Sequence, residues 1–266
     1  MLIRIDVGAL YSSWRSNSAP MWRRLSTASI LRNAIRFGAT SRGFGRRGGT
    51  SYSRLLAMLR DGHHTPDLRA AVCWVLAQPG SHGRRAAPAL LEALADASAA
   101  VRIAAAQALG QLGAPRAVPH LITALVTDDD GEVRRAAAYA LGLIGDEGAT
   151  RALVWTLNSK DGAPAVRGMA AESLTNVGAK SAVPALLATL DDPSAEVRFW
   201  SAFALGELGG PESLPELGRV AARDMTDVPG WGTVSHEAAE AIERIQGKVA
   251  TAGATGRVSR WPLAWR

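Results

Sequence analysis

The amino-acid sequence predicts an all-α solenoid, built by stacking repeated pairs of helices. A hydrophobic residue followed by arginine recurs at intervals of 33, 32, 33 and 31 residues. Around each pair, apolar residues return with the helical period of about 3.6 residues. Units of this length stack on their neighbours and bury a continuous core. We therefore expect about six helix pairs within residues 51–246 and no β-sheet; the recurring pairs are Leu68-Arg69, Val101-Arg102, Val133-Arg134, Val166-Arg167 and Val197-Arg198, with a weaker copy at Val234-Ser235.

The first helix of each repeat is expected to be short and to begin beside a proline. Residues 117–125 and 182–190 are typical examples, and Pro88, Pro119 and Pro184 lie near their starts. Proline is tolerated there because the first turn of a helix has no acceptor for its N–H groups.

The second helix is expected to follow an acidic loop and to end at a glycine. Carboxylates in such loops cap the helix and favour its positive N-terminal end. Counting from the valine as position 0, positions 4, 5, 7 and 8 are small or apolar and lie within about 160° of one another. This arc is the predicted packed face, and the terminating glycines are Gly113, Gly145, Gly178 and Gly209.

The arginine at position 1 recurs in five repeats, at Arg69, Arg102, Arg134, Arg167 and Arg198. Because it lies at the edge of the packed arc, its stem is expected to be buried and its head paired. Aspartates four to six residues earlier are the expected partners, which makes each arginine a structural staple: Asp96, Asp130, Asp161 and Asp192. The alternative is a ladder of arginines that binds phosphates.

Positions 2, 3 and 6 of the second helix vary between repeats and lie opposite the packed arc. In the fifth repeat all three are aromatic. Such residues are typical of protein interfaces, so we expect a partner-binding patch on the concave face. The alternative is that the fifth-repeat aromatics fill a gap beside residues 224–232; the candidate patch is Trp74, Tyr139, Met169, Phe199, Trp200 and Phe203.

The recurring pattern D-x-x-x-x-V-R-x-x-A-A-x-A-L-G-x-L-G resembles HEAT repeats of the short phycobilisome-lyase-like type, over about residues 51–246. The resemblance implies a right-handed α-solenoid whose second helices line the concave side. Members of that family include bilin lyases, an iron hydroxylase (deoxyhypusine hydroxylase) and many scaffolds, so the resemblance implies a fold more specifically than a function.

Residues able to support chemistry are few, and we expect no catalytic site, metal or cofactor. The resemblance to that hydroxylase implies a diiron site made of several His-Glu pairs, each at positions 2 and 3 of a second helix. In this sequence only His236-Glu237 matches that pattern. One such pair cannot supply the ligands of two metals. His63-His64 lies in a polar loop, and Cys73 takes a position that other repeats give to alanine. The sequence is therefore expected not to be an enzyme, with a bilin lyase or chaperone as the alternative.

The two ends differ from the rest in charge. Residues 1–50 carry nine arginines and one acid, and residues 247–266 carry four basic residues and no acid, whereas the remainder has a net charge of −6. The N-terminal extension includes the glycine-rich segment 43–49 and an amphipathic stretch at 28–37, and its arginine- and serine-rich composition is typical of a transit peptide. A retained anchoring arm is the alternative, and the basic C-terminal tail, residues 247–266, supports it.

Taken with the repeats, these features favour a protein-binding scaffold, an accessory or assembly subunit of a larger complex. A mitochondrial location is expected, with plastid or cytoplasm as alternatives. A second alternative is an RNA- or ribosome-associated protein that uses residues 1–50. The sequence contains no stretch long and apolar enough to predict a transmembrane helix.

Overall fold

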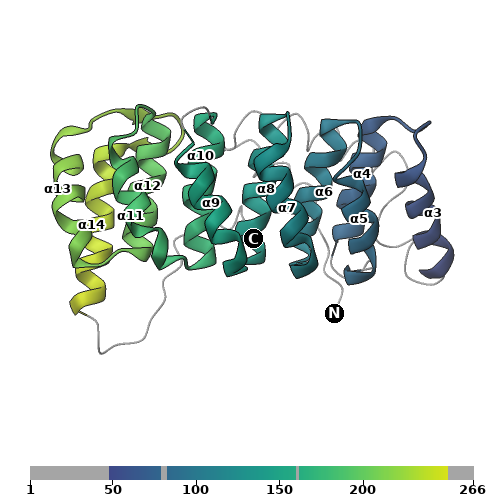
Figure 1. Ribbon diagram of the computed structural model, residues 1–266, viewed down its shortest axis with the longest axis horizontal. Helices are drawn as coiled ribbons and strands as arrows, with labels where there is room; N and C mark the ends of the chain where they lie inside the picture. The colour runs from purple at the N-terminus through teal and green to yellow at the C-terminus, as the bar shows by residue number, and fades with distance from the viewer. Residues whose placement is uncertain (1–47, 79–82, 160–161, 251–266) are drawn as a thin grey trace, which may run out of the picture.

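The computed structural model describes residues 48–78, 83–159 and 162–250, and these form a single row of helix pairs (Figure 1). We call the first helix of each pair the A helix and the second the B helix. The A helices within the described residues are α3 (Gly48–Arg60), α5 (Ala87–Ala93), α7 (Val118–Thr127), α9 (Thr150–Leu157), α11 (Val183–Ala188) and α13 (Leu214–Arg223). The B helices are α4 (Pro66–Ala77), α6 (Ala99–Gln111), α8 (Gly131–Ile144), α10 (Pro164–Val177), α12 (Ala195–Leu208) and α14 (Val234–Ala250). The prediction of an all-α solenoid with six helix pairs is confirmed.

Short 3₁₀ turns lead into most of the A helices or close them. Where an A helix begins, proline occupies its first turn in α5, α7, α11 and α13, as the sequence predicts. These helices enter directly from the turn without a side-chain cap, because the turn already occupies the first N–H groups. The 3₁₀ segments are Gly83–Ala86, Pro115–Ala117, Glu147–Ala149, Lys180–Ala182, Thr189–Asp191 and Pro211–Ser213.

Glycine ends the B helices in two different ways. Gly113, Gly145 and Gly178 have φ of 54°, 70° and 75°, the left-handed conformation that reverses the chain at low cost only for glycine. Gly209, expected to do the same, has φ of −75° and continues in an extended conformation. A second glycine and Pro211 follow it, and they carry the chain away from α12 without a left-handed residue.

The B helices lie on the inner side of the stack. Each B helix packs along its length against the next, from α4 through α14, whereas successive A helices touch at few places. A stack whose B helices are closer together than its A helices curves toward the B helices. In Figure 1 the pairs follow one another along the long axis of the molecule in chain order. We call the face of the B helices that turns away from the A helices the inner surface.

The core is a seam of small side chains between neighbouring B helices, with leucines beneath it. The predicted packed positions are buried in the repeats: in α8, Val133, Ala137, Ala138 and Leu141 all have no exposed area. Alanine at these positions allows the helix axes to approach closely, and burial of the valine and leucine side chains provides the main stabilisation. In α12 the seam includes Ser201, whose hydroxyl is 2.7 Å from that of Thr189.

One expectation about secondary structure is wrong. The link between α13 and α14 contains a short antiparallel pair, β1 (Asp227–Val228) and β2 (Gly232–Thr233). The intervening turn has Gly230 and Gly232 at φ of 85° and 108°, values that allow a tight reversal. This hairpin explains the stretched spacing before the sixth repeat, which the helical period alone does not predict.

The helical array runs from Gly48 to Ala250, slightly past the sequence-based limits of 51 and 246. The transit-peptide interpretation of residues 1–50, and the arm interpretation of the C-terminal tail, residues 247–266, concern residues that are almost all outside the described part of the chain. Among the described residues, no helix is both long enough and apolar enough to span a bilayer.

Candidate functional site

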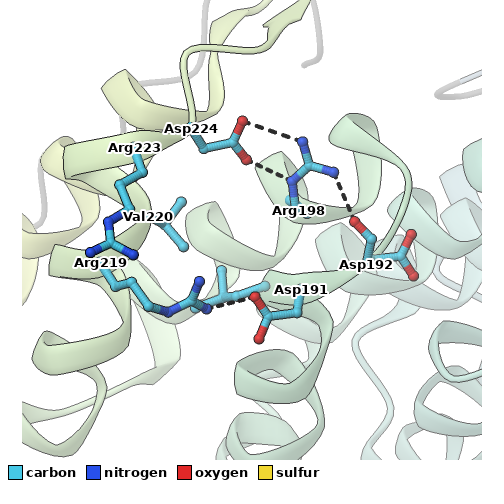
Figure 2. Close-up of a pocket in the computed structure, with 8 residues that line it drawn as sticks. Asp191, Asp192, Arg198, Arg219, Val220, Arg223 and Asp224 are labelled. Atoms are coloured by element: carbon cyan, nitrogen blue, oxygen red, sulfur yellow. Dashed lines mark hydrogen bonds and ion pairs between the residues drawn. The ribbon is translucent and has the colours of Figure 1, made fainter.

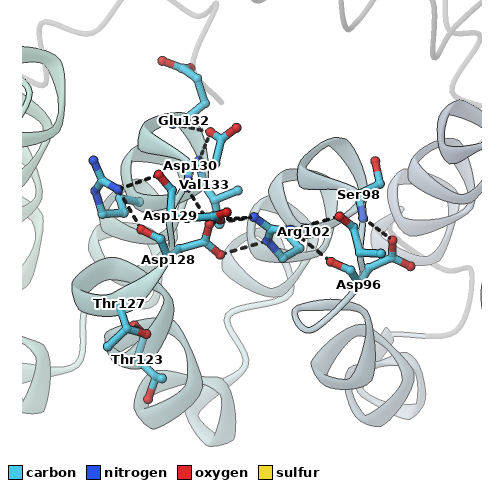
Figure 3. Close-up of polar contacts among 12 residues, drawn as sticks. Asp96, Ser98, Arg102, Thr123, Thr127, Asp128, Asp129, Asp130, Glu132 and Val133 are labelled. Carbon is cyan, nitrogen blue, oxygen red and sulfur yellow. Dashed lines mark hydrogen bonds and ion pairs between the residues drawn. The ribbon is translucent and has the colours of Figure 1, made fainter.

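A ladder of alternating arginine and aspartate connects the loops between A and B helices. Arg102, at the start of α6, donates two hydrogen bonds of 2.9 and 2.8 Å to the carboxylate of Asp128 in the following repeat (Figure 3). Its third nitrogen donates to the backbone carbonyl of Asp96, at 3.0 Å, in its own repeat. Arg102 therefore bridges two successive loops, and Arg167 and Arg198 do the same.

The aspartates complete the pattern. Asp128 accepts the backbone N–H of Asp130 at 3.0 Å while it accepts the guanidinium of Arg102, and Asp130 caps α8 by accepting from Glu132 and Val133. An aspartate two residues before the cap thus shapes its own loop and binds the preceding repeat. Within the described residues, the pairs that join successive repeats in this ladder are Arg69–Asp96, Arg102–Asp128, Arg167–Asp192 and Arg198–Asp224, and Arg102 also pairs with Asp129 at 2.9 Å.

This geometry corrects the predicted pairing of the arginines. The sequence-based partners, Asp96, Asp130 and Asp192, were expected to offer carboxylates to the arginine of their own repeat. Asp96 and Asp192 offer their backbone carbonyls to it instead, and their carboxylates face the previous repeat. Arg134 likewise donates to the carbonyl of Asp128, at 2.7 Å. Asp161, the residue at the matching interval after Arg134, is outside the described residues.

The ladder is a structural feature, because its charges are already paired and sheltered. The side chains of Arg167 and Asp192 are each 8% exposed. Burial raises the pKa of Asp128, but hydrogen bonds from Arg102 and from the loop outweigh it and leave the pKa lower than usual. A guanidinium with a buried carboxylate partner has little capacity left for phosphate.

The last step of the ladder borders a shallow pocket of about 290 Å³ (Figure 2). Three arginines and three aspartates line it, together with Leu190 and Val220. Arg198 pairs with Asp224, and Arg219 donates to Asp191 at 2.7 Å. Because positive and negative side chains are equal in number, this pocket does not select for an anion or a cation.

The aromatic residues of the fifth repeat form a cluster on the inner surface, but two of them are not exposed. Phe199 is 4% and Trp200 6% exposed, which corrects the expectation of an open aromatic patch. The rings meet edge to face: Trp200 lies 5.4 Å from Phe199 and 5.6 Å from Phe203 between centroids. Such contacts stabilise the fold, in line with the gap-filling alternative.

Trp231, which the repeat pattern does not single out, covers this cluster. The hairpin between α13 and α14 holds its ring 4.9 Å from Trp200 and 6.4 Å from Phe199, while 39% of Trp231 stays exposed. The sequence feature that could have indicated this hairpin is the irregular repeat spacing after α12. Four other candidates are partly exposed at the inner surface: Trp74, Tyr139, Met169 and Phe203.

Charged residues of α8, α12 and α14 lie near this cluster. Arg135 of α8 contacts Glu132, and Arg244 of α14 lies over the ring of Phe203, at 5.2 Å from its centroid. Arg244 also pairs with Glu237, and lies 3.6 Å from Glu207.

Two carboxyl groups, Glu196 of α12 and Glu237 of α14, have a raised pKa. Burial raises the pKa of Glu196, although the charge of Arg135 opposes the shift. Burial also raises the pKa of Glu237, against a hydrogen bond from Arg244. Both groups therefore hold their negative charge less readily than an exposed glutamate.

The other chemistry-bearing residues do not converge on a site. Cys73 is fully buried, and burial raises the pKa of its thiol to about 12, so it is no nucleophile. His236 pairs with Glu240, at 3.4 Å, and His64 with Asp61, at 3.7 Å. Over the described part of the chain, no three His, Cys, Asp or Glu side chains are grouped as metal ligands. The described residues around His236-Glu237 therefore do not provide the ligands that a two-metal site of the hydroxylase type needs.

A family model for HEAT repeats matches residues 52–142, 87–163 and 150–243, which together cover most of the chain. The chain is a HEAT-repeat protein.

In the solved complex of CpcE and CpcF of phycocyanin lyase from Nostoc sp. PCC7120, a chain 30% identical to this HEAT-repeat protein aligns with a TM-score of 0.52. The alignment covers 63% of this chain and 69% of that one. The resemblance to lyase-like repeats is thereby confirmed. YibA of Escherichia coli, 20% identical, aligns with a TM-score of 0.50 over 87% of this chain and 99% of that one, which shows the shared fold alone.

Among curated proteins, deoxyhypusine hydroxylase of Drosophila pseudoobscura pseudoobscura is 37% identical over 94 residues. The match covers 35% of this HEAT-repeat protein and 30% of the hydroxylase, so the chain spans less than a third of that relative's length. The expectation that the chain is not an enzyme is wrong by this comparison, because repeats this similar belong to an enzyme.

Proposed function

We propose that this HEAT-repeat protein is a scaffold that binds a partner protein on its inner surface, as an accessory or assembly subunit of a larger complex. The observation that carries the proposal is that different positions of a B helix serve packing and face the inner surface. In α6, α8, α10 and α12, positions 0, 4, 5, 7 and 8 are small or apolar and buried, whereas positions 2, 3 and 6 differ between these helices and lie toward the inner surface. A face that varies while the packing positions stay constant is free to be shaped for a ligand.

Exposed apolar side chains support the proposal. Leu143 of α8 is 39% exposed and lies one helical turn after the partly exposed Tyr139. Trp231, which covers the aromatic cluster, is also 39% exposed. Large apolar residues that share one surface are the usual centre of a protein interface.

The test is affinity purification of the protein at its native level, with Leu143→Glu as the variant. A charge at this position should abolish co-purification of the partner and leave the melting temperature within about 2 °C of the parent, because the side chain is not in the core. The matched control is Trp155→Glu, since Trp155 is 56% exposed on the A helix α9. Loss of the partner with Trp155→Glu and retention with Leu143→Glu would move the interface to the outer side and reject the proposal.

A second candidate is a lyase-type function in bilin handling. It is favoured by one specific observation, the 30% identity to a chain of the phycocyanin lyase complex. The purified protein mixed with free bilin should then shift the pigment's absorbance band. An unchanged spectrum at an excess of protein would remove this candidate and leave the scaffold.

The basic ends suggest how the scaffold is placed in the cell. We propose that residues 1–50 direct it to an organelle, the mitochondrion first and the plastid second, because an arginine-rich, acid-poor segment is typical of import signals. Residues 1–37 fused to a fluorescent protein should reach the organelle, and Arg32→Glu with Arg36→Glu should prevent it. A diffuse signal from the unaltered fusion would favour a cytoplasmic role, and salt-sensitive RNA binding lost without residues 1–50 would favour the RNA-associated one.

A further inference from the structure

The aromatic cluster of the fifth repeat is covered by a side chain that does not belong to a repeat helix. Phe199 and Trp200 are at positions 2 and 3 of α12, whereas Trp231 comes from the hairpin between α13 and α14. The exposed fractions differ as well, at 4% and 6% for the two residues of α12 and 39% for Trp231. Trp231 is therefore an outer layer over two rings that are already buried.

The base of this hairpin is held on both sides. Val228 is 5% exposed, and Val234 has no exposed area. The Val234 N–H donates to the Thr226 carbonyl at 3.1 Å, and the Ser235 N–H donates to the Asp224 carbonyl at 2.8 Å. Moving the base would expose apolar area and break these hydrogen bonds, so we expect it to stay in place.

The tip of the hairpin can change conformation while the base stays. Gly230 and Gly232 flank Trp231, with φ of 85° and 108°. A Cβ at either glycine would have no heavy atom within 4 Å among the described residues, so the backbone here is not packed against a neighbouring element. Glycine exchanges positive and negative φ at low cost, and rotation at these two residues would move the Trp231 ring without unfolding a helix.

We propose that Trp231 is an intramolecular competitor, and that an aromatic side chain of the partner protein displaces it and binds to Phe199 and Trp200. The inference rests on the proposed function and names the chemistry of the partner's contact residue. The ring of Trp231 shows what this position accepts, because it already lies there as a side chain carried by a separate segment.

The geometry of the contacts favours an aromatic ligand over an aliphatic one. Trp231 is inclined by 70° to Trp200, at 4.9 Å between centroids, and by 48° to Phe199, at 6.4 Å. Tilted and edge-to-face contacts of this kind add to the gain from burying apolar area. Trp200 also lies against α10, where a Cβ at Gly168 would be 2.9 Å from its Cδ1. This second contact does not involve the hairpin, so Trp200 keeps its support when Trp231 leaves.

Competition by Trp231 sets the size of the expected effect. Only molecules with a displaced Trp231 can bind the partner's ring, so the apparent affinity falls by the fraction of such molecules. With about one molecule in ten in this form, removal of the Trp231 side chain raises the affinity about tenfold. Tenfold corresponds to about 1.4 kcal/mol, so the same removal should lower the melting temperature by no more than about 6 °C.

The test uses a fluorescein-labelled peptide with the sequence of residues 226–234, TDVPGWGTV, as the probe. Fluorescence anisotropy should show that it binds to the full chain carrying Trp231→Ala with a Kd of about 100 µM, and to the parent about tenfold more weakly. The same peptide with alanine in place of tryptophan should not bind to Trp231→Ala. In affinity purification, Trp231→Ala should retain more partner than the parent, and excess tryptophan peptide should release it.

The matched control is Trp155→Ala, which removes a tryptophan that is 56% exposed on the A helix α9. It should bind the peptide no more tightly than the parent does. Equal binding to the parent and Trp231→Ala would place the peptide elsewhere and overturn the proposal, as would no binding to either protein. A fall in melting temperature well beyond about 6 °C for Trp231→Ala would show that this ring is core and cannot be displaced.

The partner supplies two further outcomes that count against the proposal. Less partner recovered with Trp231→Ala would show that Trp231 itself contacts the partner. Partner that stays bound in excess tryptophan peptide would show that it does not use Phe199 and Trp200. Each of these failures leaves the proposed function standing if Leu143→Glu still releases the partner, whereas partner binding that is unaffected by Leu143→Glu rejects that function itself.

Discussion

Replacing Gly110 by alanine should destabilise the protein, although alanine is the better helix former. Gly110 is in the last turn of α6, where it lies against Ala140 of α8. A Cβ at Gly110 would lie 2.8 Å from the Cα and 3.0 Å from the Cβ of Ala140, and 3.3 Å from Leu143 Cδ1. The closest of these atoms belongs to the backbone, so no side-chain rotation relieves the contact.

The expected magnitude follows from two opposing terms. Alanine in a helix interior is favoured over glycine by about 1 kcal/mol. Restoring an ordinary carbon contact of about 3.5 Å would move α8 away by roughly 0.7 Å, and a gap of that size forfeits a quarter to a half of each dispersion contact along the seam. Overpacking of this kind costs about 3 kcal/mol at its upper range, so the free energy of unfolding should fall by about 2 kcal/mol.

The assay is thermal unfolding followed by circular dichroism. For a domain of this size, a loss of about 2 kcal/mol lowers the melting temperature by roughly 4–8 °C. The control is Gly218→Ala in α13, where a Cβ would have no heavy atom within 4 Å. There only the helix propensity acts, and the melting temperature should rise by about 2–4 °C. If both variants are stabilised alike, α6 and α8 do not approach as described, and the close spacing of the inner surface is refuted.

Three further predictions concern the ladder, the thiol and the aromatic cluster. Asp128→Asn should cost about 2 kcal/mol at neutral pH, because it removes the sheltered carboxylate that pairs with Arg102 and leaves only the exposed carboxylate of Asp129. Since the pKa of Asp128 is lowered on folding, this contribution is complete above about pH 4 and is lost as the pH falls through the lowered value; an unchanged stability gap at pH 3 would contradict it. Cys73, with its thiol pKa raised to about 12, should resist iodoacetamide at pH 8 until denaturant is added, and rapid labelling of the folded protein would show that the thiol is accessible. Trp200→Ala should cost about 3–5 kcal/mol, whereas a melting temperature within about 2 °C of the parent would place its ring outside the core.

The repeat pattern was sufficient to predict the helix pairs and their buried faces. Val133, Ala138 and Leu141 are buried where the helical period places them, and Cys73 is buried for the same reason. Such positions are predictable because each repeat contacts only its neighbours, so one set of side-chain sizes satisfies every seam.

The arginine at position 1 was predicted to be paired and sheltered, but its partner was assigned to the wrong repeat. Separation along the chain favoured the aspartate six residues away, and Arg198 does contact Asp192, through its carbonyl oxygen. The carboxylate that pairs with Arg198 belongs to Asp224, 26 residues later. Only stacking of the repeats brings that residue near, so a local spacing argument cannot find it.

By itself, the sequence determined the all-α class, the six repeats and the face of each B helix that packs, because these follow from periodicity and residue size. The tertiary structure alone decided which variable residues are exposed. The hairpin before α14 brings Trp231 over Trp200, and so converts an expected aromatic surface into a covered cluster with carboxylates around it. Exposure depends on what lies across the stack from a residue, and no period within one helix records that.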